Sequence, residues 1–132
     1  MNRYLLDTHS LLWAILEPEK LGKQAISILE DVDNRVFVSS ITFWEISLKY
    51  SIGKLMLSCN PDDLLTIVDE MEFEKMPLMA EETALFYQLP RLLHKDPFDR
   101  MLIWQAISHD LVLISKDGKF EDYEQYGLKV VW

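Results

Sequence analysis

Short strand-like apolar runs alternate along the chain with segments of helical periodicity. The strand-like runs are residues 3–6, 36–38, 73–76, 111–114 and 130–132. Between them, apolar residues recur at helical spacing, which predicts helices over residues 9–16, 21–29, 43–52, 60–71, 80–89 and 96–109. Pro18, Gly53 and Pro90 mark the ends of three of these helices. Such alternation is typical of an α/β fold with a parallel sheet and right-handed crossovers.

The length and composition are those of one folded domain. The chain has 132 residues, and 49% of them are apolar, enough for one sizeable core. We therefore expect a single domain over residues 1–132. The only cysteine, Cys59, rules out an internal disulfide and a cysteine-based zinc cluster.

No apolar run approaches the roughly 20 residues that a membrane-spanning helix needs. The first residues lead directly into a strand pattern and lack the long apolar region of a signal peptide. We therefore expect a cytoplasmic protein without a membrane partner.

The net charge is −9, from 13 basic and 22 acidic residues. This balance disfavours a protein that coats nucleic acid by neutralising phosphates. It does not exclude a nuclease with a small footprint, because acidic residues that bind divalent cations contribute to the count without repelling the substrate once the cations are bound.

Four acidic residues lie where a strand-like run meets a helix, or on the helix that follows such a run. They are Asp7, Glu45, Asp99 and Asp117. In an open parallel sheet the carboxyl ends of the strands converge on one crevice, so these distant residues are expected to share a small volume. Clustered carboxylates repel one another, and a bound divalent cation compensates for that repulsion. The pattern predicts a metal-dependent enzyme.

Each of these acids also has an ordinary structural explanation. Asp7 can be a helix N-cap, Glu45 can form a surface ion pair with Lys49 four residues on, and Asp117 before Gly118 can belong to a turn. Asp99 lies at the third position of a helix whose N-cap is expected to be Asp96, where a capping-box acid is common. Four independent coincidences on one sheet edge are less plausible than one shared site, so we assign Asp99 to the metal and Asp96 to capping or support.

Polar neighbours of the four acids are candidates for supporting the site or contacting a substrate. The hydroxyls are expected to orient a carboxylate or a water, and the cations to meet a phosphate. These candidates are Thr8, Ser115, Asp96, Lys49, His94 and Arg100.

Other chemistries find less support in the sequence. The four glycines are isolated, so no phosphate-binding glycine loop is present, and no serine nucleophile elbow occurs. The three histidines lack a metal-ligand spacing, which leaves His94 as a substrate contact at most. The four tryptophans are interpreted as core or interface residues rather than base-stacking platforms.

Five segments together resemble PIN-domain ribonucleases, specifically the VapC-type toxins of toxin–antitoxin pairs. The segments are residues 5–13 (LLDTHSLLW), 38–46 (VSSITFWEI), 53–55 (GKL), 94–103 (HKDPFDRMLI) and 113–117 (LISKD). They occur in the order expected for the family. Residues 59–89 contribute little to the resemblance. One departure is mild: Ser115-Lys116-Asp117 stands where Thr-Arg-Asp is frequent.

This resemblance implies a PIN-like three-layer α/β/α fold with a central, mostly parallel sheet of four to five strands. It also implies that Asp7, Glu45, Asp99 and Asp117 bind Mg²⁺ or Mn²⁺ and catalyse RNA cleavage. A cognate antitoxin protein and a homodimer are the expected partners. Two alternatives stay open: a non-catalytic, metal-stabilised protein-interaction module, and a DNA-directed or structure-specific nuclease that uses the same acids.

Overall fold

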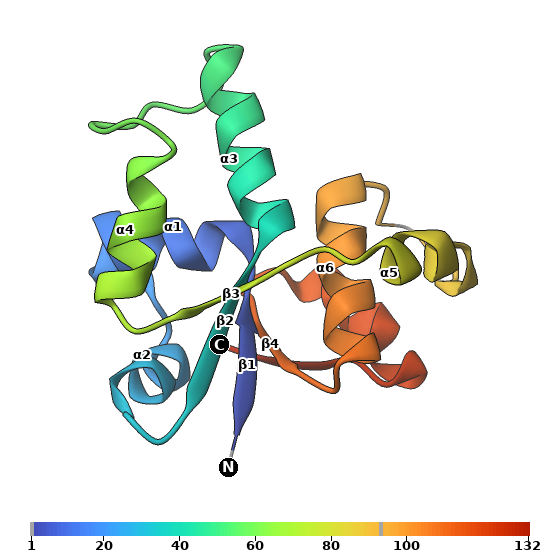
Figure 1. The fold of residues 1–132 in the computed structure, drawn as a ribbon. Coiled ribbons are helices and arrows are strands. Elements are labelled where there is room, and N and C mark those ends of the chain that lie inside the picture. The colour runs from blue at the N-terminus through green and yellow to red at the C-terminus, as the bar shows by residue number, and fades with distance from the viewer. Residues whose placement is uncertain (1, 93) are drawn as a thin grey trace.

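A sheet of five parallel strands forms the centre of the computed structural model, which describes residues 2–92 and 94–132 (Figure 1). Met1 and Leu93 belong to the predicted 1–132 domain but lie outside the described residues. The spatial order is β3-β2-β1-β4-β5, which confirms the predicted parallel sheet. The strands are β1 (Arg3–Leu6), β2 (Arg35–Ser39), β3 (Glu74–Met76), β4 (Val112–Ile114) and β5 (Lys129–Val131).

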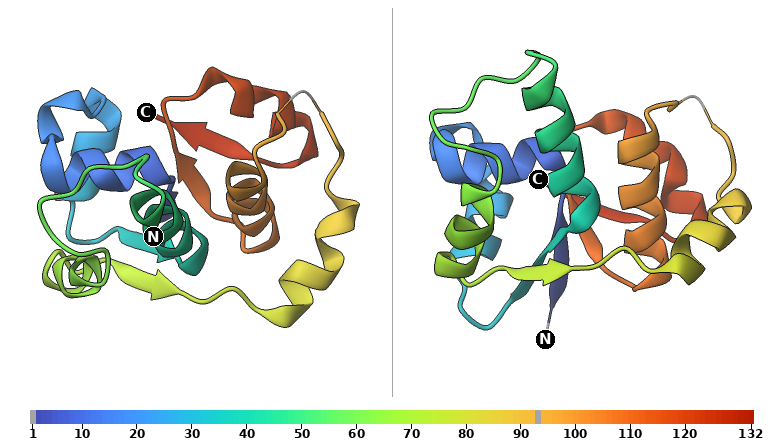
Figure 2. Two further views of the ribbon diagram at one scale, coloured as in Figure 1. Left: turned by 90° about the horizontal axis from the view of Figure 1, so that it is seen from above. Right: turned by 45° about the horizontal axis from the view of Figure 1, so that its top comes forward.

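Helices cover both faces of this sheet, as the views in Figures 1 and 2 show, so the predicted three-layer α/β/α architecture is confirmed. The α-helices are α1 (Thr8–Leu16), α2 (Lys23–Glu30), α3 (Ser40–Ser51), α4 (Asp63–Glu70), α5 (Ala80–Leu85) and α6 (Pro97–Ser108). Three segments are 3₁₀ helices: η1 (Pro18–Lys20), η2 (Phe86–Gln88) and η3 (Gly118–Tyr126). Within the described ranges, none of the helices combines the length and apolar character needed to cross a membrane.

The central strand β1 supplies both hydrophobic cores, because successive side chains of a strand point to opposite faces. Leu6 packs in the core with α1, α2, α3 and α4, whereas its neighbour Leu5 packs in the core with η2, α6 and η3. Both leucines are fully buried. A strand covered on both sides has no polar face, which explains why this run is apolar without alternation.

Three helical segments differ from the sequence-based prediction, one of them the short 3₁₀ helix η1, which was not predicted. The helix predicted over residues 80–89 is divided into α5 and η2. The 3₁₀ helix η3 was not predicted, since its sequence is polar and lacks a 3.6-residue pattern. Its buried residues, Phe120 and Tyr123, are three positions apart, which is the repeat of a 3₁₀ helix.

The strand order places a topological switch point between β1 and β4. From β1 the chain continues to β2 and β3 on one side of the sheet, and β4 and β5 lie on the other side. Leu6 and Ile114 are paired in register at the carboxyl ends of the two strands. Ligand sites of open α/β sheets lie in the crevice at such a point, and Asp7 and Ser115 are the first residues beyond it.

Candidate metal centre

Asp7 is held at the carboxyl end of β1 by backbone and side-chain hydrogen bonds. Its backbone N–H donates to the carbonyl of Ile114 (3.2 Å), and its Oδ1 accepts the N–H of Ser10 (2.8 Å), so the residue also caps α1. Only 5% of Asp7 is exposed. Burial raises the pKa of this carboxyl above its usual value, although hydrogen bonds from Ser10 and Ser115 oppose the shift.

Glu45 is buried on α3, with 3% of its surface exposed. The hydroxyl of Thr8 donates to its Oε1 (2.6 Å), and Lys49 forms an ion pair with its Oε2. An ordinary surface ion pair is therefore the wrong explanation for this residue. Partial burial lowers the pKa of the Lys49 ammonium, but the hydrogen bond and charge of Glu45, with the charges of Asp96 and Asp99, give a net increase.

Asp96 and Asp99 have different tasks at the start of α6. Asp96 is the N-cap, because its Oδ1 accepts the N–H groups of Phe98 (2.8 Å) and Asp99 (3.1 Å), so the predicted capping role is confirmed. Asp99 instead directs its Oδ2 to Nε2 of His94 (2.9 Å). Burial raises the pKa of Asp99 to about 6; the hydrogen bond with His94 opposes this increase, whereas the charges of Asp96 and Glu45 add to it.

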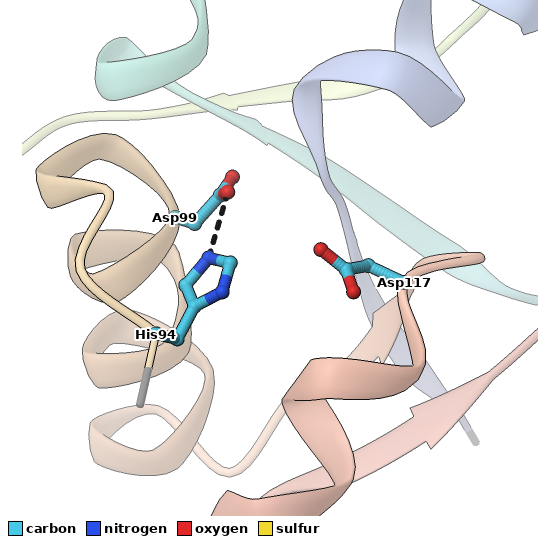
Figure 3. Close-up of side chains that lie close together, drawn as sticks. All are labelled: His94, Asp99 and Asp117. Atoms are coloured by element: carbon cyan, nitrogen blue, oxygen red, sulfur yellow. Dashed lines mark hydrogen bonds and ion pairs between the residues drawn. The ribbon is translucent and has the colours of Figure 1, made fainter. Parts of the chain in front are cut away.

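Asp117 faces His94 and Asp99 from the other side of an opening, as Figure 3 shows. Its Oδ1 accepts the N–H of Lys119 (2.9 Å), which caps η3, and its own N–H donates to Ser115 Oγ (3.1 Å). One potential ligand atom each from His94, Asp99 and Asp117 lies within 4.8 Å of the other two.

His94 therefore lies closer to the acidic site than the sequence analysis expected. His94 and Asp99 are five residues apart, which is not the spacing of two ligands on one face of a helix. His94 precedes α6, and the turn capped by Asp96 folds the chain so that the imidazole reaches Asp99. His94 is buried, with 8% exposed, and its ring packs edge-on against Phe120 of the unpredicted helix η3. The sequence analysis named His94 as a candidate for supporting the site or contacting substrate, but no spacing rule pointed to its hydrogen bond with Asp99.

The four predicted acids are neighbours in one region. Asp7 and Asp117 line one hollow, and Asp99 and Asp117 line the next. Glu45 is near enough to Asp99 to raise its pKa, and it is tied to Thr8, the residue after Asp7. Four segments distant in sequence thus bring their carboxylates to the same end of the sheet, although the group of three possible ligands found within 4.8 Å of one another among the described residues is His94, Asp99 and Asp117, without Asp7 or Glu45.

The negative charge of this region is only partly compensated. Over residues 2–92 and 94–132, Lys49 pairs with Glu45 and His94 with Asp99, whereas no Lys, Arg or His lies within ion-pair distance of Asp7 or Asp117. Buried carboxylates without a cation are costly. Carboxylate oxygens are the ligands that Mg²⁺ and Mn²⁺ prefer, so the donor set fits a hard divalent cation.

Lysines surround the acids in three hollows. The hollow with Asp99 and Asp117, about 590 Å³, contains Lys95 and Lys119; the hollow with Asp7, about 240 Å³, contains Lys116; the hollow with Glu45, about 280 Å³, contains Lys49 and Lys54. The protein therefore offers cations locally, despite its net negative charge.

Arg100 has other partners. Its guanidinium lies 4.8 Å from the centre of the Phe86 ring, and Nη2 donates to the carbonyl of Leu89 (3.4 Å). Neither partner belongs to the acidic site, so we do not carry the predicted substrate contact of Arg100 further.

Comparisons with known proteins identify the family and the fold. The family model for the PIN domain matches residues 4–125. The chain is similar to Ribonuclease VapC22 of Mycobacterium tuberculosis (strain ATCC 25618 / H37Rv), with 25% identity over 132 residues and all of each chain covered. The resemblance seen in the sequence is thereby confirmed.

Two solved structures show the same fold. One is the crystal structure of VapBC2 from Rickettsia felis bound to a DNA fragment from their promoter, with a TM-score of 0.72, 19% identity and 98% of each chain covered. The other is the crystal structure of DNA-bound VapBC from Salmonella typhimurium, with a TM-score of 0.66, 20% identity, and coverage of 99% of this chain and 98% of the other.

Replacing Asp99 by asparagine should stabilise the metal-free protein at about pH 7.5 and not at about pH 4. The folded-state pKa of about 6 lies above the ordinary value of 3.8. The stabilising contribution of this carboxyl is thus fully present below the unfolded-state pKa and is lost as the pH rises through the folded-state pKa. The difference in unfolding free energy at neutral pH should be on the order of 1–3 kcal/mol, measured by thermal denaturation with EDTA.

The matched control is Asp62→Asn, because Asp62 is exposed and its side chain caps no helix. That variant should unfold with the wild type at both pH values. A lower melting temperature for Asp99→Asn at neutral pH would show that the carboxylate is already compensated within the protein.

Proposed function

Since this chain belongs to the PIN domain family, we propose that it is a Mg²⁺- or Mn²⁺-dependent endoribonuclease that hydrolyses phosphodiester bonds of RNA. The observation that carries the proposal is the gathering of Asp7, Glu45, Asp99 and Asp117 at one switch point, with Asp7 buried and unpaired by any described cationic side chain. The similarity to a protein named as a ribonuclease supports RNA as the substrate.

The proposed division of tasks is the one that the sequence suggests, and the structure adds His94, which shares a group of possible ligand atoms with Asp99 and Asp117. Asp7 and Asp99 would hold the cation most directly, and Glu45 and Asp117 directly or through waters. A bound Mg²⁺ or Mn²⁺ supplies a more acidic water and offsets charge on the phosphate oxygens. His94 fixes one oxygen of Asp99, which limits the rotation of that carboxylate.

Glu45 is the proposed base for the attacking water. The Thr8 hydroxyl holds its Oε1 and the Lys49 ammonium pairs with its Oε2, so Oε2 would take the proton once Lys49 turns from it to a substrate phosphate. Attack by water leaves a 5′-phosphate and a 3′-hydroxyl and does not require the ribose 2′-hydroxyl. For that reason a DNA-directed or structure-specific nuclease is the alternative that the same residues would serve.

The lysine-containing hollows support a nucleic-acid substrate. Lys95 and Lys119 flank the acids on one side, and Lys49 and Lys54 on another. The backbone phosphates on either side of the cleaved bond would each lie near one of these pairs of lysines. The acidic net charge then limits binding to a short stretch of nucleic acid around the site.

An antitoxin is the proposed protein partner, since the solved neighbours are VapBC structures. A largely apolar hollow of about 550 Å³ offers a surface for a partner helix. It is lined by residues of α1, η1 and α2 and of the connection between α4 and β3, with Glu19 and Glu30 as its acidic members, which favours a partner with basic residues beside its apolar ones.

A homodimer is the proposed state of the chain alone. A second apolar hollow of about 270 Å³ lies between α3, α5, η2 and α6, and Trp44 in its wall is 60% exposed. Exposed apolar surface of this kind commonly marks an interface.

Light scattering on a sizing column should give twice the chain mass for the protein alone. Co-expression with the protein encoded by the neighbouring reading frame should yield a larger complex that has lost nuclease activity. A monomer that forms no complex with that product would remove both proposed partners without affecting the assignment of the acids. The expected cytoplasmic location also stays a prediction.

Asp7→Asn should lower the rate of RNA cleavage at least about a hundredfold, because one cation ligand loses its charge while the residue keeps its shape. Asp62→Asn is the control and should cleave like the wild type. The assay compares single-stranded RNA, single-stranded DNA and duplex DNA, with Mg²⁺, with Mn²⁺ and with EDTA.

Cleavage of RNA that stops in EDTA and in the Asp7 variant is the expected result. Preferential cleavage of DNA would favour the alternative nuclease. Absence of cleavage in every metal-containing reaction, with antitoxin-free protein, would favour the non-catalytic module.

A further inference from the structure

Two aromatic side chains of α1, His9 and Trp13, lie beside the acidic site and are called here the aromatic wall. His9 and Trp13 are four residues apart on α1 and thus on one face, with ring centroids 5.7 Å from each other. The rings of Trp132 and Trp13 pack in a T-shaped arrangement with their centroids 5.6 Å apart. Trp132 is itself held against Gly22, where even a Cβ would lie only 2.6 Å from Trp132 Cδ1, so the indole has little freedom to move.

This wall faces the hollow of about 240 Å³ that contains two of the proposed metal ligands. The hollow is lined by Asp7, His9, Trp13, Lys116 and Asp117. Nζ of Lys116 lies 5.8 Å from the centre of the Trp13 ring, so a cation and an aromatic face share one small space. The volume is below the roughly 300–1,000 Å³ of pockets that enclose whole small ligands, and it suits one ring-sized group.

The other two hollows around the acids have a different chemistry. The hollow with Lys95 and Lys119 and the hollow with Lys49 and Lys54 contain no Trp, Tyr or Phe side chain. They offer charge for phosphates but no large aromatic surface. The hollow at Trp13 offers both, which is the combination that proteins use to bind single-stranded nucleic acid by stacking a base and holding its phosphate.

We propose that the hollow formed by Asp7, His9, Trp13, Lys116 and Asp117 is a pocket for the nucleobase that adjoins the cleaved phosphate. The inference rests on the proposed nuclease function and adds a specific contact to it. Because Asp7 and Asp117 line both the pocket and the acidic site, a base in this pocket belongs to a nucleotide at the reacting bond. Trp13 provides the stacking surface, and Lys116 binds the phosphate of the same nucleotide.

The test combines a protein variant with an altered substrate. A short single-stranded RNA oligonucleotide that the wild type cleaves is prepared as a series in which one base at a time is replaced by hydrogen. Each member is assayed with wild-type protein, with Trp13→Leu and with Trp13→Phe. Tyr87→Leu is the matched control, since it removes an aromatic ring that is 79% exposed and lines none of the three hollows.

For the wild type and for Tyr87→Leu, loss of one base next to the cleaved bond should raise KM about tenfold or more. Trp13→Leu should cleave the intact and the abasic RNA with the same, raised KM, and Trp13→Phe should restore part of the difference. The inference is overturned if Trp13→Leu responds to every abasic position as the wild type does.

A second measurement needs neither turnover nor a Trp13 variant. Asp99→Asn protein is irradiated with RNA that carries 5-iodouridine at single positions, and the crosslinked peptide is identified by mass spectrometry. One position should link to Trp13; crosslinks only to residues outside the pocket overturn the inference. If the wild type cleaves no RNA, the proposed function fails, and the crosslink alone decides on the pocket.

Discussion

Uncompensated negative charge at the carboxyl ends of β1 and β4 is the constraint on which the rest of the structure depends. Asp7 cannot move away from it, because its N–H is bonded to Ile114 of the neighbouring strand and its carboxylate caps α1. Asp99 is partly buried nearby, with a pKa raised to about 6. A protein that buries carboxylates in this way gives up stability unless a cation binds.

The fold supplies the site through its connectivity rather than through any local motif. Asp7 and Asp117 follow two adjacent strands, whereas Glu45 and Asp99 belong to α3 and α6. Only the switch of strand order between β1 and β4 opens a crevice into which helices from both faces can direct side chains. Net charge does not reveal such a site, because the lysines that favour a phosphate are collected around it.

Much of this arrangement could be predicted from local patterns. The apolar run before Asp7 has no alternation because β1 is covered on both faces, and Asp96-Pro97 marks the start of α6 as an N-cap and first-turn proline do elsewhere. Features that depend on tertiary contacts were missed. The helix η3 has a repeat of three in a polar sequence, and His94 reaches Asp99 only because the capped turn folds back.

Trp13 illustrates the same limit. Its sequence pattern, a large apolar residue on an amphipathic helix, indicates a core position, and the indole does pack against Trp132. The hollow that Trp13 also lines is completed by Lys116 and Asp117, more than 100 positions further along the chain. No helical pattern contains that information.

The most direct test is a crystal structure of the protein soaked with Mn²⁺, recorded for anomalous scattering. The account predicts a Mn²⁺ peak about 2 Å from carboxylate oxygens of Asp7 and Asp99, near Asp117 and Glu45, and its loss in the Asp7→Asn variant. A well-ordered structure with no peak among these residues, at a Mn²⁺ concentration that supports cleavage, would contradict it.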